Sequence, residues 1–337
     1  MEKFGKVIVK LRIPILILSF LLLIPSAIGY FNTRVNYDIL YYLPNEIETM
    51  QGQDILMDDF NKGAYAMVVV QNMDTKSTDR LIKKVENVDH VAQVISYTGI
   101  VGEDVPSEIV PSKFRKYFEN DSTDTTLFAI FFDNTTSSDD TMNAIIQIRE
   151  QTEGQAFISG MSAVVTDTKN LSEKETPLYV LIAVVLVCIV LAIFMDSFLV
   201  PVFFMISIGM AIVYNLGSNI LLGEVSYITK ALAAVLQLGV TLDYSIFLWH
   251  SYKEMKEIYP DDHKEAMAVA ISNTLTSVVG SSITTVAGFI ALCFMSFTLG
   301  LDLGIVMAKG VVFGVIGCVT ILPSLILTFD RALENAS

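Results

Sequence analysis

Six long apolar runs, separated by polar segments of very different lengths, dominate the pattern of this chain. Each run has roughly the 20 residues that an α-helix needs to cross the hydrocarbon core of a bilayer. The pattern therefore predicts an α-helical polytopic membrane protein with six spans. The runs cover residues 11–30, 177–195, 198–222, 228–250, 275–297 and 303–328.

The polar segment between the first two runs is much longer than the others and predicts a separate domain. Strand-like alternation and helical spacing follow one another along it, in the order β-α-β-α-β-α-β. This order favours a small α+β ferredoxin-like sandwich. The expected strands cover residues 65–71, 91–97, 126–133 and 155–159, and the expected helices cover residues 78–88, 111–119 and 138–150. Residues 161–176 are expected to form a helix that leads back to the membrane.

Acidic residues are concentrated in the long polar segment. Residues 31–174 contain 23 Asp and Glu against 12 Lys and Arg, whereas the other 193 residues contain 13 and 10. Of all 337 residues, 53% are hydrophobic and 17% are charged. Soluble domains are about 25% charged, so this composition indicates an integral membrane protein. The net charge of −14 argues against a nucleic-acid partner, because phosphate contacts need basic patches.

Basic residues gather in the short segments on one side of the six spans, which predicts that this side is cytoplasmic. A multi-pass protein of the cell membrane follows, with both termini inside and the large domain outside. A cleaved signal peptide is the alternative for the first run, but its length favours a retained span. The expected parts are residues 1–30 with the first span, an outer domain over 31–176, a five-span bundle over 177–330 and a tail over 331–337.

One carboxylate, Asp243, lies in the middle of the fourth run, beside Tyr244. A charge at that depth costs about 2.5–3.5 kcal/mol on insertion scales, so chains keep such residues mainly where the charge or its proton is used. We therefore expect Asp243 to carry protons. Tyr244 lies about 100° further round the helix and would serve a carboxylate on a facing helix. The alternatives are a structural carboxylate satisfied by its neighbours and a tyrosine that only packs.

The fifth and sixth runs add polar groups that could support such a relay. Ser277, Ser281, Thr284 and Thr285 fall on one helix face, where their hydroxyls could hold a water wire. The alternative is that small residues simply allow close helix packing. Lys309 is a second charge within the membrane, which either couples to the relay or extends its ammonium group toward the outer surface.

Other chemistry finds no support in the sequence. The three cysteines all lie in apolar runs and the three histidines are scattered, so neither a disulfide framework nor a metal site is expected. The membrane runs contain no paired aspartates, and no Ser-His arrangement, metal motif or phosphate-binding loop is present. The sequence therefore argues against an enzyme and predicts no cofactor, with a proton gradient as the energy source.

Three segments, in order, carry a resemblance to a known family. They read GVTLDYSIFLWHSYKE over residues 239–254, SSITTVAGFIAL over 281–292 and LDLGIVMAKGVVFGVIGCVTILPSLIL over 301–327. The chain resembles the RND superfamily of permeases, in its MMPL-type branch. The resemblance implies that Asp243 and Tyr244 relay protons and that the outer domain is a porter domain that handles hydrophobic or lipidic substrates.

Permeases of this superfamily usually have twelve spans in two similar halves, whereas this chain has six and no internal repeat. We therefore expect a homodimer, or one half of a larger permease, that exports lipids or other hydrophobic compounds. In a two-fold dimer the fourth spans would meet, and Asp243 of one copy would reach Tyr244 of the other. The alternative is a non-transporting protein, either a sterol-sensing-like sensor or a helper in membrane assembly or translocation.

Overall fold

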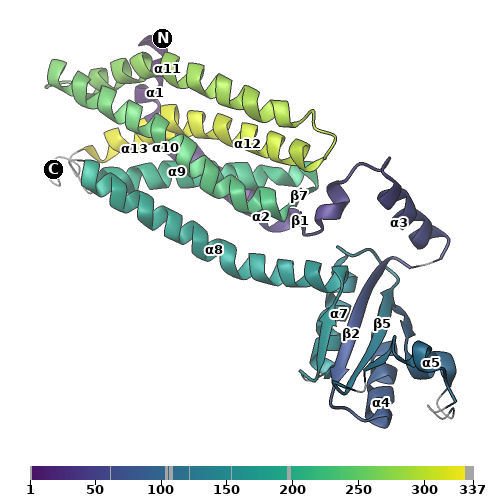
Figure 1. The fold of residues 1–337 in the computed structure, drawn as a ribbon. Coiled ribbons are helices and arrows are strands. Elements are labelled where there is room, and N and C mark those ends of the chain that lie inside the picture. Colours follow the sequence, from purple (N-terminus) through teal and green to yellow (C-terminus); the bar gives the residue numbers. More distant parts are fainter. Residues whose placement is uncertain are drawn as a thin grey trace. The chain divides into compact units, whose positions relative to one another are not determined.

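Figure 1 shows the computed structural model of the chain, which describes residues 2–60, 62–102, 105, 109–120, 122–152, 154–195 and 199–330. The chain divides into two compact units. Unit 1 combines Met1–Asn36 with Ser172–Ser337, and unit 2 comprises Tyr37–Leu171. Residues 196–197, which separate the second and third apolar runs, and the predicted tail at residues 331–337 lie outside the described residues.

Among the residues that the structure describes, six helical segments are long and apolar enough to cross a membrane, as the hydrophobic pattern predicted. The protein is therefore a polytopic membrane protein. The segments contain α2 (Arg12–Asn32), α8 (Met161–Phe194), α9 (Leu199–Gly217), α10 (Tyr227–Ile258), α11 (His263–Leu292) and α12 (Leu299–Ile316). A 3-10 turn, η2 (Ser218–Leu222), follows α9, while a π-helical turn, η3 (Gly317–Ile321), and α13 (Leu322–Thr328) follow α12.

The fourth and fifth helices are longer than their apolar runs. The intervening polar segment, residues 251–273, does not form a separate element, because α10 continues to Ile258 and α11 begins at His263. Tyr252 and Met255 are buried on the extension of α10, so the helix keeps an inward face beyond the apolar run. Asp262 caps α11 by accepting hydrogen bonds from the backbone N–H groups of the next turn.

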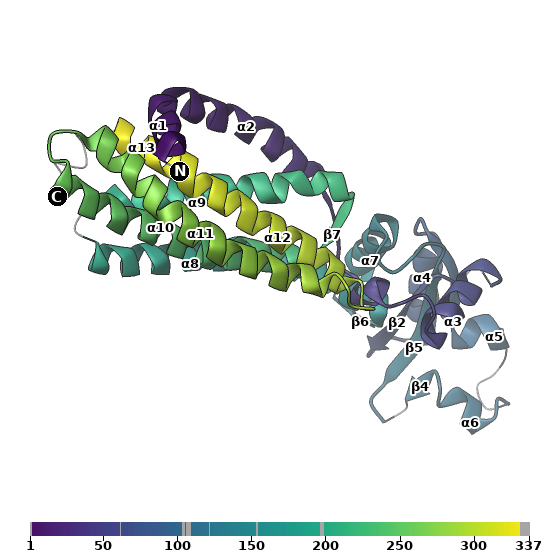
Figure 2. The same cartoon turned by 90° about the horizontal axis from the view of Figure 1, so that it is seen from above.

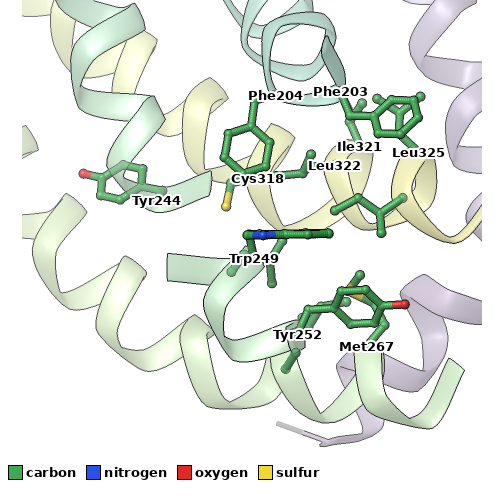
Figure 3. Packing of buried hydrophobic residues seen from close by; sticks show 14 of the residues in the cluster. Phe203, Phe204, Tyr244, Trp249, Tyr252, Met267, Cys318, Ile321, Leu322 and Leu325 are labelled. Atoms are coloured by element: carbon green, nitrogen blue, oxygen red, sulfur yellow. The ribbon is translucent and has the colours of Figure 1, made fainter. Parts of the chain in front are cut away.

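Helices α10, α11 and α12 run side by side in Figures 1 and 2, and their contacts confirm this arrangement. The core beside them contains large side chains from four helices, seen in Figure 3. Phe204 from α9, Leu248 from α10, Ile271 from α11 and Leu322 from α13 are fully buried there. Burial of such side chains holds the unit together, and shape complementarity determines how closely the helices approach.

Two glycines allow α2 and α9 to touch through their backbones. A Cβ on Gly29 would be 3.0 Å from the carbonyl carbon of Gly217, and a Cβ on Gly217 would be 2.6 Å from the Cα of Ser26. Tyr214 adds a hydrogen bond from its hydroxyl to the carbonyl oxygen of Ser19, at 2.6 Å. Small residues at such crossings are typical of membrane helices.

Unit 2 contains an antiparallel sheet with strand order β3-β5-β2-β6. Its elements follow the order β-α-β-β-α-β, and α4 and α7 cover one face with a buried apolar core. The elements are β2 (Ala64–Gln71), α4 (Thr75–Glu86), β3 (Val91–Ile95), β5 (Thr125–Phe132), α7 (Asp139–Thr152) and β6 (Ala156–Ser159). The smaller elements are η1 (Ile39–Tyr42), α3 (Glu48–Asp58), α5 (Tyr97–Val101), α6 (Ser112–Arg115) and β4 (Glu119–Asn120).

Three details of unit 2 differ from the sequence prediction. The helix expected over residues 111–119 is only the short α6, because the chain then enters β4 and pairs with β5. The sequence analysis missed α3, none of whose residues is buried, so no apolar stripe marks it. The helix expected over residues 161–176 is present, but it continues without interruption as the membrane helix α8.

A short parallel pairing lies at one end of unit 1. Strand β1 (Arg34–Asn36) follows α2 and pairs with β7 (Glu224–Ser226), which directly precedes α10. The sequence analysis predicted no element between the third and fourth apolar runs, because three-residue strands leave no periodic pattern. The pairing joins the start of α10 to the chain segment that leads into unit 2.

Candidate functional site

Helix α10 positions the two residues that the sequence singled out. Its N-cap is Ser226, whose hydroxyl oxygen accepts a hydrogen bond from the backbone N–H of Ile228 at 3.2 Å. The helix then continues for 32 residues without proline, so neighbouring positions are separated by about 100° throughout. Asp243 consequently points away from the unit and is exposed, whereas Tyr244 points inward and is only 3% exposed.

This arrangement corrects one prediction for a dimer. We expected Asp243 of one copy to reach Tyr244 of the other. The Tyr244 hydroxyl oxygen is fully buried within its own chain, and Tyr244 belongs to the core cluster drawn in Figure 3. A second copy that docks on the surface cannot reach that hydroxyl in this packing. The two residues of the Asp-Tyr pair therefore belong to different faces of α10, one exposed and one buried.

The face that carries Asp243 is open. Gly239 lies one turn before Asp243 and Phe247 one turn after it, and both are exposed. A Cβ built on Gly239 would meet no heavy atom within 4 Å. A carboxylate thus lies exposed in the middle of an apolar helix, with a small residue one turn away on the same surface.

The adjacent helix α11 presents the hydroxyl groups that the sequence placed on one face. Ser277, Ser281 and Thr284 are exposed, and Thr285 is half-buried. Thr284 and Thr285 each donate a hydrogen bond to the carbonyl oxygen of Ser281, at 2.7 and 3.1 Å, so the oxygens of these hydroxyls remain free to accept. Gly280 and Gly288 on the same helix also have open space around them.

Lys309 does not join this surface. Its ammonium group donates a hydrogen bond to the side-chain oxygen of Asn219 at 2.6 Å. Next to Lys309, Gly310 packs against a buried amide pair in which Asn215 donates to Gln237 at 2.9 Å. The structure thus brings Lys309 together with a polar layer between α9, α10 and α12, and it does not bring Lys309 to Asp243.

The inward side of α10 carries a second polar feature that the sequence analysis missed. Four side chains on this side each have a buried donor or hydroxyl with no hydrogen-bond partner in the described part of the chain. They belong to Gln237, Thr241, Tyr244 and Trp249. Each such group costs about 1–3 kcal/mol unless water or a conformational change satisfies it. Their recurrence three to five residues apart was the available signal, but bulky apolar neighbours obscured it.

The start of α10 is tied to the start of α12 by Asp302. One oxygen of this carboxylate accepts a hydrogen bond from the backbone N–H of Ser226 at 2.8 Å and another from the hydroxyl of Thr229 at 2.6 Å. The sequence analysis assigned no role to Asp302, which lies just before the sixth apolar run. Its partners are more than 70 positions away in the chain, so no local pattern could have identified them.

No group of three or more potential metal ligands occurs within the residues that the structure describes. The candidate site therefore consists of a lone carboxylate, a hydroxyl-bearing face and a buried polar layer. These groups can exchange protons and bind water, and none of them is arranged as a nucleophile with its base.

Comparison with known families now identifies the group to which the chain is related. The sequence model of the MMPL family matches residues 42–336. The chain belongs to the MMPL family. The match includes all of α10, α11 and α12, and therefore the whole candidate site.

Among individual relatives, this MMPL-family chain is 24% identical to a membrane protein of Methanocaldococcus jannaschii, over 94% of this chain and 91% of that protein. It is 21% identical to the apo-petrobactin exporter of Bacillus anthracis, over 92% of this chain but only 42% of that protein. The chain therefore spans most of the archaeal relative and less than half of the exporter.

Among solved structures, the fold is similar to SecDF, a translocon-associated membrane protein from Thermus thermophilus. The TM-score is 0.53 with 15% sequence identity, and the match covers 96% of this chain and 38% of that one. At this identity the likeness concerns the fold alone. It extends over both units of the MMPL-family chain.

Proposed function

We propose that this protein is a proton-driven exporter of a hydrophobic compound, and that it works with the exposed faces of α10 and α11 covered by a second copy or by a second homologous half. The observation that carries the proposal is the exposed position of Asp243 in the middle of an apolar membrane helix. A carboxylate facing lipid would cost several kcal/mol. A covering partner would remove that cost and create a closed polar interface.

The hydroxyl face of α11 supports a specific arrangement of that interface. In a two-fold dimer each copy contributes one α10 face and one α11 face. Asp243 of one copy would then meet Ser281 and Thr284 of the other, which takes the place of the contact with Tyr244. Protonation of Asp243 would neutralise a charge in the interface and change how tightly the two faces pack, and this movement would drive export.

Relatives support the same division into halves. The apo-petrobactin exporter of Bacillus anthracis is an export protein by its name, and this chain corresponds to less than half of it. A longer relative thus has room for a second half, which would correspond to the partner proposed for the exposed faces of α10 and α11. Membrane transport is the activity that the family and this relative favour for the chain.

Unit 2 supports a hydrophobic cargo. The sheet face opposite its helices carries the exposed side chains of Tyr65, Met67 and Phe157. Cross-strand pairing places Tyr65 opposite Phe131 and Val69 opposite Phe157, so these apolar groups adjoin one another. We propose that unit 2 is an extracytoplasmic ferredoxin-like porter domain and that this apolar face contacts the exported compound.

The proposed interface can be tested through its glycines. Replacement of Gly280 by leucine fills open space on the α11 face, so the single chain should fold normally while its dimer is lost. The matched control is Gly209→Leu on α9, which also has open space but lies on another helix. Light scattering of the purified protein measures the outcome. Equal dimer fractions for both variants and wild type would exclude this interface.

A second candidate function follows from the likeness to SecDF. A translocation helper would have the same fold and would not need to move a hydrophobic compound. Purified protein in vesicles with an imposed pH gradient separates the two, because an exporter accumulates a lipophilic dye in a gradient-dependent manner. No dye movement, together with co-purification of a translocation channel, would favour the helper.

A further inference from the structure

A cavity of about 520 Å³ lies between α1 (Glu2–Lys10), the start of α2 and the start of α11. Its walls are held together by a close helix contact, because a Cβ on Gly5 would be 2.9 Å from the carbonyl carbon of Ala268. The sequence analysis predicted no helix before the first apolar run, which begins at residue 11. Neither the proposed relay nor the outer domain uses this cavity.

Four basic side chains line the cavity, together with two carboxylates, Asp262 and Glu265. Both carboxylates have partners. Glu265 forms an ion pair with Lys6 at 2.8 Å, and Asp262 accepts hydrogen bonds at 3.1 Å from the backbone N–H groups of Lys264 and Glu265. The hydrogen bond to Glu265 raises the pKa of Lys6, which therefore remains charged at neutral pH.

The other three cations, Lys10, Arg12 and Lys264, form no ion pair with the acidic side chains that the structure describes. The start of the 30-residue helix α11 adds the positive end of its dipole, while the backbone N–H groups of Lys264 and Glu265 are already bonded to Asp262. The cavity thus has an excess of positive charge and hydrogen-bond donors. This combination is suited to a phosphate group.

The position of the cavity identifies the source of the phosphate. Arg12 is the first residue of the first membrane-spanning helix, and Ile13 and Pro14 continue the cavity wall as exposed apolar residues. Helix α1 is amphipathic, with Lys3, Lys6 and Lys10 on one face and exposed Phe4 and Val7 on another. Helices of this kind lie in the plane of the membrane interface, at the depth of lipid headgroups.

We propose that this cavity binds the headgroup of an anionic phospholipid, with the phosphate held by Lys10, Arg12 and Lys264 and the acyl chains lying along Ile13 and Pro14. The volume is within the range of small-ligand sites. Both carboxylates of the cavity already have partners, so neither is available to hold the ammonium group of a zwitterionic lipid. The site therefore selects a lipid with net negative charge, and the lipid joins α1 and α2 to α11.

The test uses the full-length protein, purified in detergent and stripped of lipid, with native mass spectrometry to count bound lipids. Phosphatidylglycerol should bind and phosphatidylcholine should not. Replacement of Lys10 by glutamine should weaken binding about five-fold, and replacement of all three cations about 100-fold, as expected for roughly equal contributions from each charge. The matched control is Lys3→Gln, on the same helix but outside the cavity lining, which should change binding less than two-fold.

Three outcomes would overturn the proposal. If Lys3→Gln and Lys10→Gln weaken phosphatidylglycerol binding equally, positive charge merely attracts the lipid to the surface and the cavity is not a specific binding site. Equal binding of phosphatidylcholine would exclude selection by charge. Inorganic phosphate that displaces phosphatidylglycerol at equal concentration would mean that the cavity binds a free anion rather than a lipid. A melting curve of each variant without lipid identifies any that fails to fold, and Lys264→Gln alone then replaces the triple variant.

Discussion

The backbone contact between α2 and α9 gives a stability prediction whose size follows from the structure. A Cβ on Gly217 would lie 2.6 Å from the Cα of Ser26, which is ~0.8 Å closer than the 3.4 Å at which ordinary contact begins. The two helices must therefore separate when Gly217 is replaced by alanine. Overpacking of this kind costs typically about 1–3 kcal/mol. A helical alanine recovers up to about 1 kcal/mol relative to glycine.

Comparison with a matched variant isolates the loss of stability that the steric overlap causes. Gly209 lies on the same helix, and a Cβ there would meet nothing within 4 Å, so Gly209→Ala gains the helical preference without the overlap. We expect Gly217→Ala to be less stable than Gly209→Ala by about 2 kcal/mol, the middle of the overpacking range. Unfolding by dodecyl sulfate in mixed micelles, followed by circular dichroism, measures both. A Gly217→Ala protein as stable as the Gly209→Ala protein would refute the close approach of these helices.

Three further substitutions test other parts of the account. Asp302→Ala removes the acceptor for Ser226 and Thr229 and should lower the free energy of unfolding by about 2–4 kcal/mol, with a smaller loss for Asp302→Asn. Lys309→Met should destabilise the protein by about 1–3 kcal/mol, because Asn219 loses its donor. The same variant should leave proton uptake intact, and a loss of uptake would place Lys309 in the relay. Tyr214→Phe should cost about 1 kcal/mol, and an unchanged unfolding midpoint would contradict the hydrogen bond to α2.

The number of membrane helices followed directly from the sequence, because a bilayer imposes a length and a composition on each span. The ends of the helices did not. The polar turns that extend α10 to Ile258 and begin α11 at His263 contain good helix formers, and only their packing shows that they belong to the membrane helices. A hydropathy pattern marks where a helix is apolar rather than where it ends.

The sequence predicted which residues form the candidate site, but it did not predict how their side chains lie relative to one another. Helical spacing alone predicted that the hydroxyls of α11 share one face and that Asp243 and Tyr244 point in directions about 100° apart. Which of these directions faces the interior depends on the neighbouring helices, so the contact between Asp243 and Tyr244 across a dimer was wrong. The bond between Lys309 and Asn219 joins residues 90 positions apart, and no local pattern in the sequence encodes it.

The central claim is that Asp243 carries protons for transport, and one measurement tests it most directly. Vesicles containing the purified protein, with a pH-sensitive dye inside, report proton uptake after a pH jump. The account predicts that Asp243→Asn abolishes uptake, whereas Glu254→Gln, an exposed carboxylate later on the same helix, leaves it unchanged. Uptake by the Asp243→Asn protein at the wild-type rate would contradict the account and would make Asp243 a structural residue.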